Sequence, residues 1–268
     1  MSKTSRRQPV GPATRALIAV CAVQFATAGP AFSQWVQHRS ASLPRTADGG
    51  PNLAAPAPRG LDGRPDLSGI WRVVAGEPAR FARPDNVPFQ PWAREFQKKV
   101  ADSFSSGRTS ERCLPSGIPQ QMLVPGLPFK IVQTPGLVLT LFEEFIDYRQ
   151  VFTDGRALPD VGKTSWFGYS VGRWEGDELV VTSTGFTDQP WLTNDGYPRT
   201  EQLRLTERYR RTTVGGMDVQ FTFDDPGAYT KPWTAVVRFE LLPDTEIIEA
   251  VCENEKYVSR LYSSTPSK

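Results

Sequence analysis

A glutamate at position 207 is the residue of this sequence best placed to do chemistry. It lies in the segment LRLTERYRR, residues 203–211, where Leu205 and Tyr209 alternate with polar and charged side chains. Because successive side chains of a β-strand point to opposite faces, Glu207 shares the apolar face with Leu205 and Tyr209. A carboxylate on a buried face either pairs with a cation or has its pKa raised by desolvation. Glu207 is therefore expected to be a general acid or base, a ligand anchor, or the structural partner of an arginine.

Asp147 and Arg149 lie two residues apart in the segment LVLTLFEEFIDYRQVF, residues 137–152. If this segment is one strand, both side chains share a face and can form an ion pair. On the surface such a pair contributes about 0–1 kcal/mol; alternatively, the two side chains line the interior of a curved sheet. In the second case Asp147 joins Glu207 as a catalytic candidate, with tyrosine or arginine as the electrophile. Arg149 then becomes a candidate for ligand binding.

Aromatic side chains supply the other ligand-binding candidates. In the stretch SWFGYSVGRW, Trp166, Ser170 and Trp174 share one face with two glycines. Small residues between two indoles leave room for a ligand, but glycines also permit the sharp coiling that curved sheets need. Tyr229 and Trp233, in DDPGAYTKPW, are expected either to close one end of the fold or to pack a loop onto its core.

Several common mechanisms are excluded by what the sequence lacks. The stretch GYSVG fits the G-x-S-x-G pattern of serine hydrolases, but that motif requires a strand-to-helix turn and a downstream histidine. Here it lies inside a predicted strand, and the single histidine, His38, precedes it. The same scarcity argues against histidine-ligated zinc, copper or non-haem iron, and no phosphate-binding loop or dinucleotide fingerprint is present. We expect no metal site and no cofactor, so an enzyme would depend on carboxylates, Tyr, Arg or Lys.

The elements that would position these residues are almost all β-strands. From residue 129 onward, turn signals such as Asp154-Gly155 separate runs rich in β-branched and aromatic residues. Successive hairpins predict an antiparallel meander, and a sheet of this many strands tends to close because closure removes its exposed edges. We expect a mostly β fold, either a calycin-like barrel or a half-open barrel, with a two-sheet β-sandwich as the alternative. The predicted strands are residues 69–74, 129–134, 137–152, 164–174, 178–186, 202–212, 217–223, 233–241 and 246–253.

One amphipathic helix is predicted near residues 91–106. Pro91 suits a first helical turn, and Gly107 ends the pattern. The apolar residues that recur every four positions, forming one stripe, are Trp92, Phe96, Val100 and Phe104.

The N-terminus predicts export. Residues 1–33 combine basic residues, an apolar stretch and the small-x-small site Ala31-Phe32-Ser33, which together indicate a signal peptide cut after Ser33, by either the general or the twin-arginine pathway. They hold four of the 31 basic residues and none of the 29 acids, so the mature chain has a net charge of −2. That balance gives no sign of a nucleic-acid partner, and no later apolar run reaches the ~20 residues of a membrane-spanning helix. The mature protein should be soluble, in the periplasm or secreted.

The remaining chain is expected to have three parts. Residues 34–65 are rich in Pro, Ala and Gly and are predicted to be a disordered tether. Residues 66–262 should form a single β-rich domain, followed by a flexible tail at 263–268. In an exported chain Cys113 and Cys252 are expected to form a disulfide, with two separate thiols as the alternative. The sequence gives no oligomeric state.

Five stretches occur together, PDLSGIW (65–71), RCLPSGIPQQM (112–122), FTDGR (152–156), GYSVGRWEGDELVVTSTGF (168–186) and LRLTERYRR (203–211). In combination they resemble a family of secreted bacterial proteins of unassigned function, over most of residues 65–255. The resemblance implies no reaction and no catalytic residues. Members of that family have histidine near the positions of Leu158 and Arg199, where this chain has none. Separately, Gly69-Ile70-Trp71 is similar to the G-x-W that opens lipocalin-like barrels, which implies a calycin-like fold.

Three classes of function remain. The first is an exported barrel protein that binds a small hydrophobic or aromatic molecule, which accounts for the Trp and Tyr content and for the lack of common catalytic groups. The second is a histidine-independent lyase, isomerase or hydratase that uses carboxylate acid–base chemistry. The third is a structural or interaction component of the cell envelope. The first class accounts best for the composition.

Overall fold

The structure is a computed structural model that describes residues 38–77, 81, 83–160 and 162–252. The chain divides into two units, residues 1–35 and residues 36–268, and every described residue belongs to the second unit. The signal peptide and the C-terminal tail predicted above lie outside the described residues.

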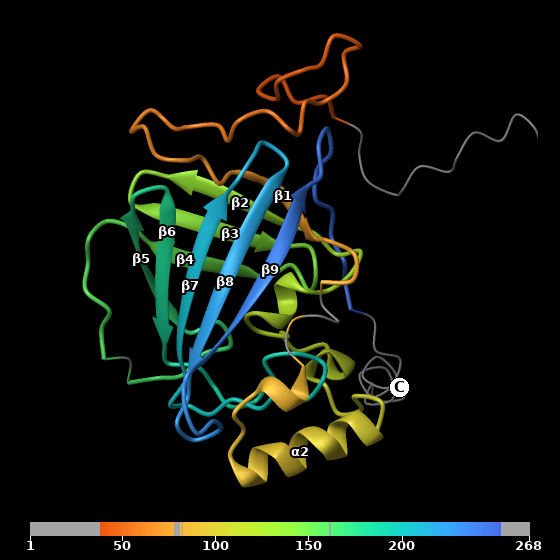
Figure 1. The fold of residues 1–268 in the computed structure, drawn as a ribbon, viewed down its shortest axis with the longest axis vertical. Helices are drawn as coiled ribbons and strands as arrows, with labels where there is room; N and C mark the ends of the chain where they lie inside the picture. Colours follow the sequence, from red (N-terminus) through yellow and green to blue (C-terminus); the bar gives the residue numbers. More distant parts are fainter. Residues whose placement is uncertain (1–37, 78–80, 82, 161, 253–268) are drawn as a thin grey trace, which may run out of the picture. The chain divides into compact units, whose positions relative to one another are not determined.

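Nine strands of the described chain close into a β-barrel (Figure 1). Each strand pairs with the next one along the chain, and β1 closes the barrel by pairing with β9. The prediction of a mostly β fold that closes into a barrel is confirmed, and the fold is consistent with a calycin-like barrel rather than a two-sheet sandwich. The strands are β1 (Gly69–Val73), β2 (Phe129–Thr134), β3 (Leu137–Phe142), β4 (Tyr148–Phe152), β5 (Tyr169–Glu175), β6 (Glu178–Thr184), β7 (Arg204–Arg211), β8 (Gly216–Asp224) and β9 (Trp233–Leu241).

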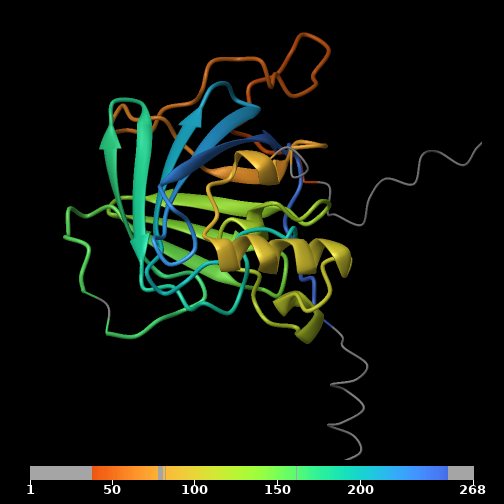
Figure 2. The same cartoon turned by 60° about the horizontal axis from the view of Figure 1, so that its bottom comes forward.

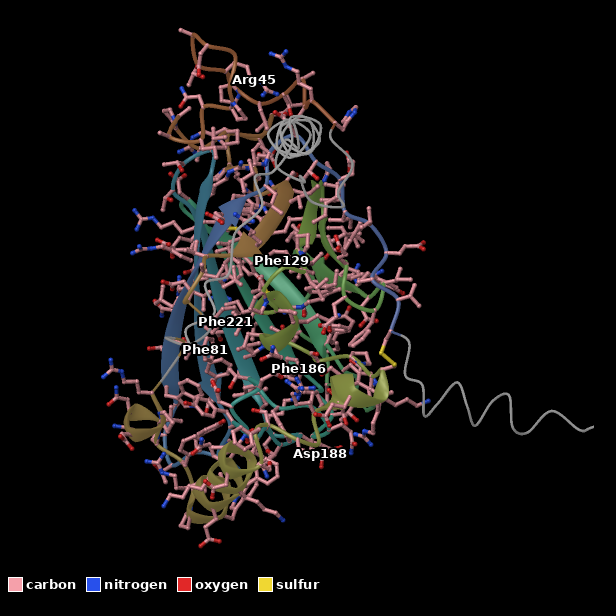
Figure 3. The ribbon with its side chains drawn as sticks, turned by 90° about the vertical axis from the view of Figure 1, so that its right-hand side faces the viewer. Arg45, Phe81, Phe129, Phe186, Asp188 and Phe221 are labelled. Carbon is pink, nitrogen blue, oxygen red and sulfur yellow. A yellow bond between two sulfur atoms is a disulfide. The ribbon has the colours of Figure 1, made fainter. Side chains whose placement is uncertain are left out.

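Aromatic and aliphatic side chains fill much of the barrel interior. Phe129 and Phe221, which are both fully buried, lie between the walls in Figure 3. Phe129 packs edge-on against Phe239, with 5.3 Å between the ring centroids. Trp71 of β1 is also fully buried, and the guanidinium of Arg211 lies 4.9 Å from the centre of its ring. At these levels the interior is a packed core.

One strand pair departs from the predicted antiparallel meander. β4 and β5 run parallel and pair only through Val151 with Ser170 and Phe152 with Val171. Parallel neighbours require a long connection that returns to the starting end of the sheet, and residues 153–168 provide it. The prediction of an all-antiparallel sheet is therefore wrong at this pair.

The segment 137–152 forms two antiparallel strands, β3 and β4, where a single strand was predicted. The turn between them comprises residues 143–147. Phe145 and Ile146 have φ angles of 61° and 59°, in the left-handed region, which a continuous strand does not contain. Asp147 and Arg149, predicted to share one face of a single strand, therefore lie in the turn and in β4 respectively.

The segment of residues 246–252, called the C-terminal segment below, is not the strand that was predicted for 246–253. Its bridge to the barrel is an isolated parallel one, between Glu144 and Ala250. The segment ends at Cys252, which forms the predicted disulfide with Cys113. This bond, drawn in yellow in Figure 3, ties the C-terminal segment to the chain that follows the short helix η3 (Thr109–Arg112).

The helix α2 (Pro91–Asp102) lies across one end of the barrel (Figure 2). It ends earlier than predicted because Phe104 and Ser105 have positive φ angles. The predicted apolar stripe is also wrong, since Trp92 and Phe104 are 47% and 94% exposed. The residues that α2 buries are Ala93, Gln97 and Val100. Within the described residues, no helix combines the length and apolar character needed to cross a membrane.

Residues 34–65 were predicted to be a disordered tether, and the described part, 38–65, follows a defined path along the other end of the barrel (orange in Figure 1). The backbone N–H groups of Val214 and Gly215, at the turn between β7 and β8, each donate to this segment at 2.9 Å. Arg45 forms two hydrogen bonds of 2.6 Å with the carboxylate of Asp244. The composition that suggested disorder therefore belongs to a segment with specific contacts to the barrel.

Candidate functional site

Glu207 and Arg149, two of the site residues proposed from sequence, meet inside the barrel. Glu207 of β7 is fully buried, and Arg149 of β4 is 3% exposed. Arg149 donates from Nη1 to Glu207 Oε1 at 2.9 Å and from Nη2 to Oε2. Two parallel hydrogen bonds are the geometry that best compensates a buried guanidinium–carboxylate pair. Asp147, the partner expected for Arg149, takes no part in this pair.

Three hydroxyl groups complete the network. Arg149 donates from Nε to Ser170 Oγ at 3.2 Å and from Nη2 to Ser183 Oγ at 2.9 Å. The Tyr209 hydroxyl donates to Glu207 Oε1 at 2.7 Å. Alternation in the sequence placed Ser170 on the face of Trp166 and Trp174, and Tyr209 on the face of Glu207. It did not indicate the face of Ser183, because five consecutive residues of β6 are buried and alternation disappears.

The network spans the seam at which the barrel has least backbone pairing. β4 and β5 share two residue pairs, whereas β5 and β6 share seven. From β4, the Arg149 side chain contacts Ser170 on β5, Ser183 on β6 and Glu207 on β7. One side chain thus links four consecutive strands across the seam, which is a structural role.

The network is poorly suited to proton transfer. Burial by itself lowers the pKa of Arg149, but the attraction of Glu207 outweighs burial and raises this pKa above its ordinary value. Burial, with the charge of Glu207, raises the pKa of Tyr209 well above its usual range. Both groups therefore hold their protons, and both carboxylate oxygens of Glu207 already accept hydrogen bonds. This geometry supports the structural interpretation of Glu207, as the partner of an arginine.

A pocket lies at the rim of the barrel, where β3 begins and β5 ends. Its volume is about 480 Å³, within the range of small-molecule sites. Trp174 lies four residues after Ser170 on β5, and Ser170 belongs to the buried network, so alternation places the indole on the same inward face. We call this site the mouth pocket, and its lining includes Leu61, Arg64, Gln133, Val138, Thr153 and Trp174.

A loop of residues 59–65, called the mouth loop, forms one wall of the mouth pocket. Gly60 N–H donates to Arg64 O at 2.8 Å, which closes the loop on itself. Arg59 makes two hydrogen bonds to the Asp177 carboxylate, at 2.9 and 2.7 Å, and so fixes one side of the loop to the turn between β5 and β6. On the other side, Gln133 Nε2 donates to Pro65 O at 3.2 Å. These contacts fix two sides of the mouth loop at the rim of the pocket.

The face proposed from Trp166 to Trp174 is not a single ligand surface. A Cβ on Gly172 would lie 3.1 Å from side-chain carbons of Val151 and Thr153, so the space beneath Trp174 is filled. Trp166 precedes β5 and therefore lies at the end of the barrel away from Trp174. Its backbone oxygen accepts a hydrogen bond from Arg199 at 3.0 Å. The structure thus places Trp174 at the mouth pocket, Ser170 in the buried network and Trp166 near neither.

Tyr229 and Trp233 pack together at the end of the barrel near α2. Both are buried, with 5.3 Å between their ring centroids. The Tyr229 hydroxyl donates to Pro198 O at 2.7 Å, and Trp233 stacks on Phe223 at 4.4 Å. Their geometry fits the packing of a loop onto the core, and neither residue lines the mouth pocket.

The turn between β3 and β4 holds a second carboxylate cluster. Gln121 Nε2 donates to Asp147 Oδ2 at 2.9 Å and to the backbone oxygen of Glu144 at 3.0 Å. Glu144 is buried, and its Oε2 has no hydrogen-bond partner among the described residues. Burial, opposed by a hydrogen bond from Ser116 and assisted by the charge of Asp147, raises the pKa of Glu144 to about 7. Burial also raises the pKa of Asp147.

The acids of this turn are visible in the sequence, but their burial is not. The burial of these acids requires the turn at 143–147 and the C-terminal segment. The sequence predicted strands at 137–152 and 246–253 instead. Among the described residues, no group of three or more His, Cys, Asp and Glu side chains is arranged to hold a metal ion.

Comparison with protein-family models and with curated proteins found no match to this chain. The resemblance to a family of secreted bacterial proteins therefore stays a prediction.

Proposed function

We propose that this protein is an exported barrel that binds a small hydrophobic or aromatic molecule at the mouth pocket. The observation that carries the proposal is the inward-facing indole of Trp174 on the wall of a pocket of about 480 Å³. A rigid aromatic side chain offers a large contact area at low cost in conformational entropy, and ligand pockets are enriched in such residues. The space beneath Trp174, next to Gly172, is filled by side chains, which confines the ligand to the rim.

Stacking on Trp174 is the expected mode of binding. The guanidinium of Arg64 now lies 5.9 Å from the centre of that ring. The Arg64 side chain is half exposed, and its contact with Asp62 is 3.8 Å long, so this ion pair contributes little. An aromatic molecule can therefore replace the guanidinium over the indole without breaking a strong interaction.

Export is proposed on the basis of the N-terminal sequence. Residues 1–33 have the charged, apolar and small-residue regions of a signal peptide. The disulfide between Cys113 and Cys252 supports this assignment, because such bonds persist in oxidising compartments.

The enzyme alternative has less support from the geometry. Both oxygens of Glu207 are engaged by donors, and Asp147 lies at the end of β3 opposite to the mouth pocket. A proton shuttle built from these two acids would have to act in two separate places.

Native mass spectrometry of the mature protein, isolated from its own periplasm, tests the proposal. We expect a non-covalent small-molecule adduct on the wild type that is lost in Trp174→Ala. Tyr148→Ala is the matched control, because Tyr148 is an aromatic residue of the same barrel that is 62% exposed and does not line the pocket. An adduct that survives in Trp174→Ala, or a wild type that carries none, would contradict the proposal.

A further inference from the structure

The end of the barrel opposite the mouth pocket carries a strained turn. Phe145 and Ile146 both have φ near +60°, and neither is a glycine. Left-handed backbone is costly for most L-residues and especially so for a β-branched one such as isoleucine. Since Ile146 is largely exposed, its own packing does not account for the conformation. Other contacts must hold the turn, residues 143–147, in this shape.

Gln121 supplies two of those contacts, and the C-terminal segment supplies others. Phe145 N–H donates to Ala250 O at 3.2 Å, and Ala250 N–H donates to Glu143 O at 3.1 Å. Ile248 N–H donates to the Glu143 carboxylate, at Oε2, at 3.2 Å. The turn and the segment therefore hold one another through three hydrogen bonds, without regular strand pairing.

Glu144 lies between Glu143 and Phe145, the two turn residues that bond to the segment. The backbone of Glu144 pairs with that of Ala250 in the isolated bridge. The side chain of Glu144 is buried, and its Oε2 has no hydrogen-bond partner among the described residues. A protonated carboxyl group tolerates such a place far better than an ionised one, because a buried charge without a counter-ion is costly.

We propose that Glu144 is a proton-controlled lock on the C-terminal segment. With Glu144 protonated, the turn stays in its strained form and residues 246–252 stay docked. When Glu144 ionises, its charge draws water into the contact, the turn relaxes and the segment detaches. The disulfide at Cys252 keeps the detached segment tethered to Cys113, so the change is reversible.

Among the charged groups of the neighbouring elements, Asp147 favours the protonated form of Glu144. Glu143 and Asp147 lie on the turn, and Asp147 adds to the upward shift of the Glu144 pKa. The C-terminal segment contributes Glu249, which is exposed. The chain before Ser116 contributes Arg108, which pairs with Glu111 at 3.4 Å. None of these forms an ion pair with Glu144 within the described residues.

The sign of the pH dependence follows from the raised pKa. Burial moves the pKa of Glu144 from 4.5 to about 7. The stabilising effect of the bound proton is therefore fully present below pH 4.5 and is lost as the pH rises through about 7. With these two values, the equilibrium constant for detachment should rise about 27-fold between roughly pH 5.5 and pH 8.

Hydrogen exchange detected by mass spectrometry measures this detachment. Exchange of the amides of residues 246–252, corrected for the intrinsic dependence on pH, should increase about 27-fold over that interval in the wild type. Glu144→Gln, a neutral side chain of the same shape, should remove the dependence and keep exchange at the low-pH level. Glu249→Gln, an exposed acid of the same segment, is the matched control and should behave as the wild type.

Asp147→Asn gives a second test that does not require Glu144 to be changed. Removing this negative charge should move the midpoint of the exchange profile to lower pH, because Asp147 raises the pKa of Glu144. A flat wild-type profile, a Glu144→Gln profile that keeps its slope, or an unmoved Asp147→Asn midpoint would each overturn the proposal. The wild-type and Asp147→Asn profiles decide the matter even if Glu144→Gln does not fold.

Discussion

The middle of the barrel and its mouth differ in whether their key side chains are already occupied by partners. In the middle, both oxygens of Glu207 are occupied by donors from Arg149 and Tyr209. At the mouth, Trp174 is only partly buried and faces an open pocket. A buried carboxylate in a strand is thus more readily explained by an ion pair than by a catalytic role. A side chain that could contact a ligand is one that, like Trp174, still has surface not covered by other residues.

Breaking the buried ion pair should have the largest effect on stability. Glu207→Ala leaves the Arg149 charge uncompensated inside the barrel, so we expect the free energy of unfolding to fall by about 3–5 kcal/mol. The double variant Arg149→Met/Glu207→Leu removes both charges and should lose less. Denaturant unfolding measures both values, and a double variant less stable than Glu207→Ala would show that the pair is not the source of the effect.

Removing the disulfide should lower stability without affecting the mouth pocket at the other end of the barrel. The bond links residues 139 apart in sequence, and its loss in Cys113→Ser/Cys252→Ser should cost about 2–4 kcal/mol. Because the mouth pocket lies at the other end, retention of a bound small molecule should not change. Native mass spectrometry and denaturant unfolding of the same sample check both points, and loss of the adduct would mean that the two ends are coupled.

Replacing Glu144 should stabilise the protein, but only at a pH above the range in which Glu144 titrates. The pKa of this acid is raised from 4.5 to about 7, so its ionised form opposes folding at pH 8. Glu144→Gln should therefore raise the free energy of unfolding by roughly 2–3 kcal/mol at pH 8 and by nothing near pH 4.5. Unfolding measured at the two pH values tests the sign, and an equal gain at both would point to a cause other than ionisation.

A small substitution tests the boundary between the middle and the mouth. Gly172→Ala places a Cβ 3.1 Å from Val151 and Thr153, so we expect a loss of about 1 kcal/mol from overpacking. Thermal unfolding is sensitive enough to detect it. A neutral or stabilising result would indicate open space beneath Trp174 and a ligand site that reaches deeper than proposed.

Alternation and turn signals were sufficient to predict the barrel and the inward face of Glu207. They could not identify Arg149 as its partner, because that contact joins β4 to β7 and skips two strands. The turn at 143–147 carries no Gly or Pro, so the left-handed Phe145 and Ile146 gave no local warning. The mouth loop was misassigned because its Pro and Gly content resembles that of a disordered segment, whereas its order comes from distant partners such as Asp177.

A titration with 8-anilinonaphthalene-1-sulfonate, an aromatic probe, followed by ¹H–¹⁵N NMR tests most directly where a ligand binds. The indole N–H signal of Trp174 is assigned with Trp174→Phe. We expect saturable shifts at this indole and at the Thr153 amide, which both belong to residues of the mouth pocket, with the Ser183 amide unmoved. Shifts centred on Ser183 and Ser170, in the buried network, would place the ligand in the middle of the barrel and contradict the account.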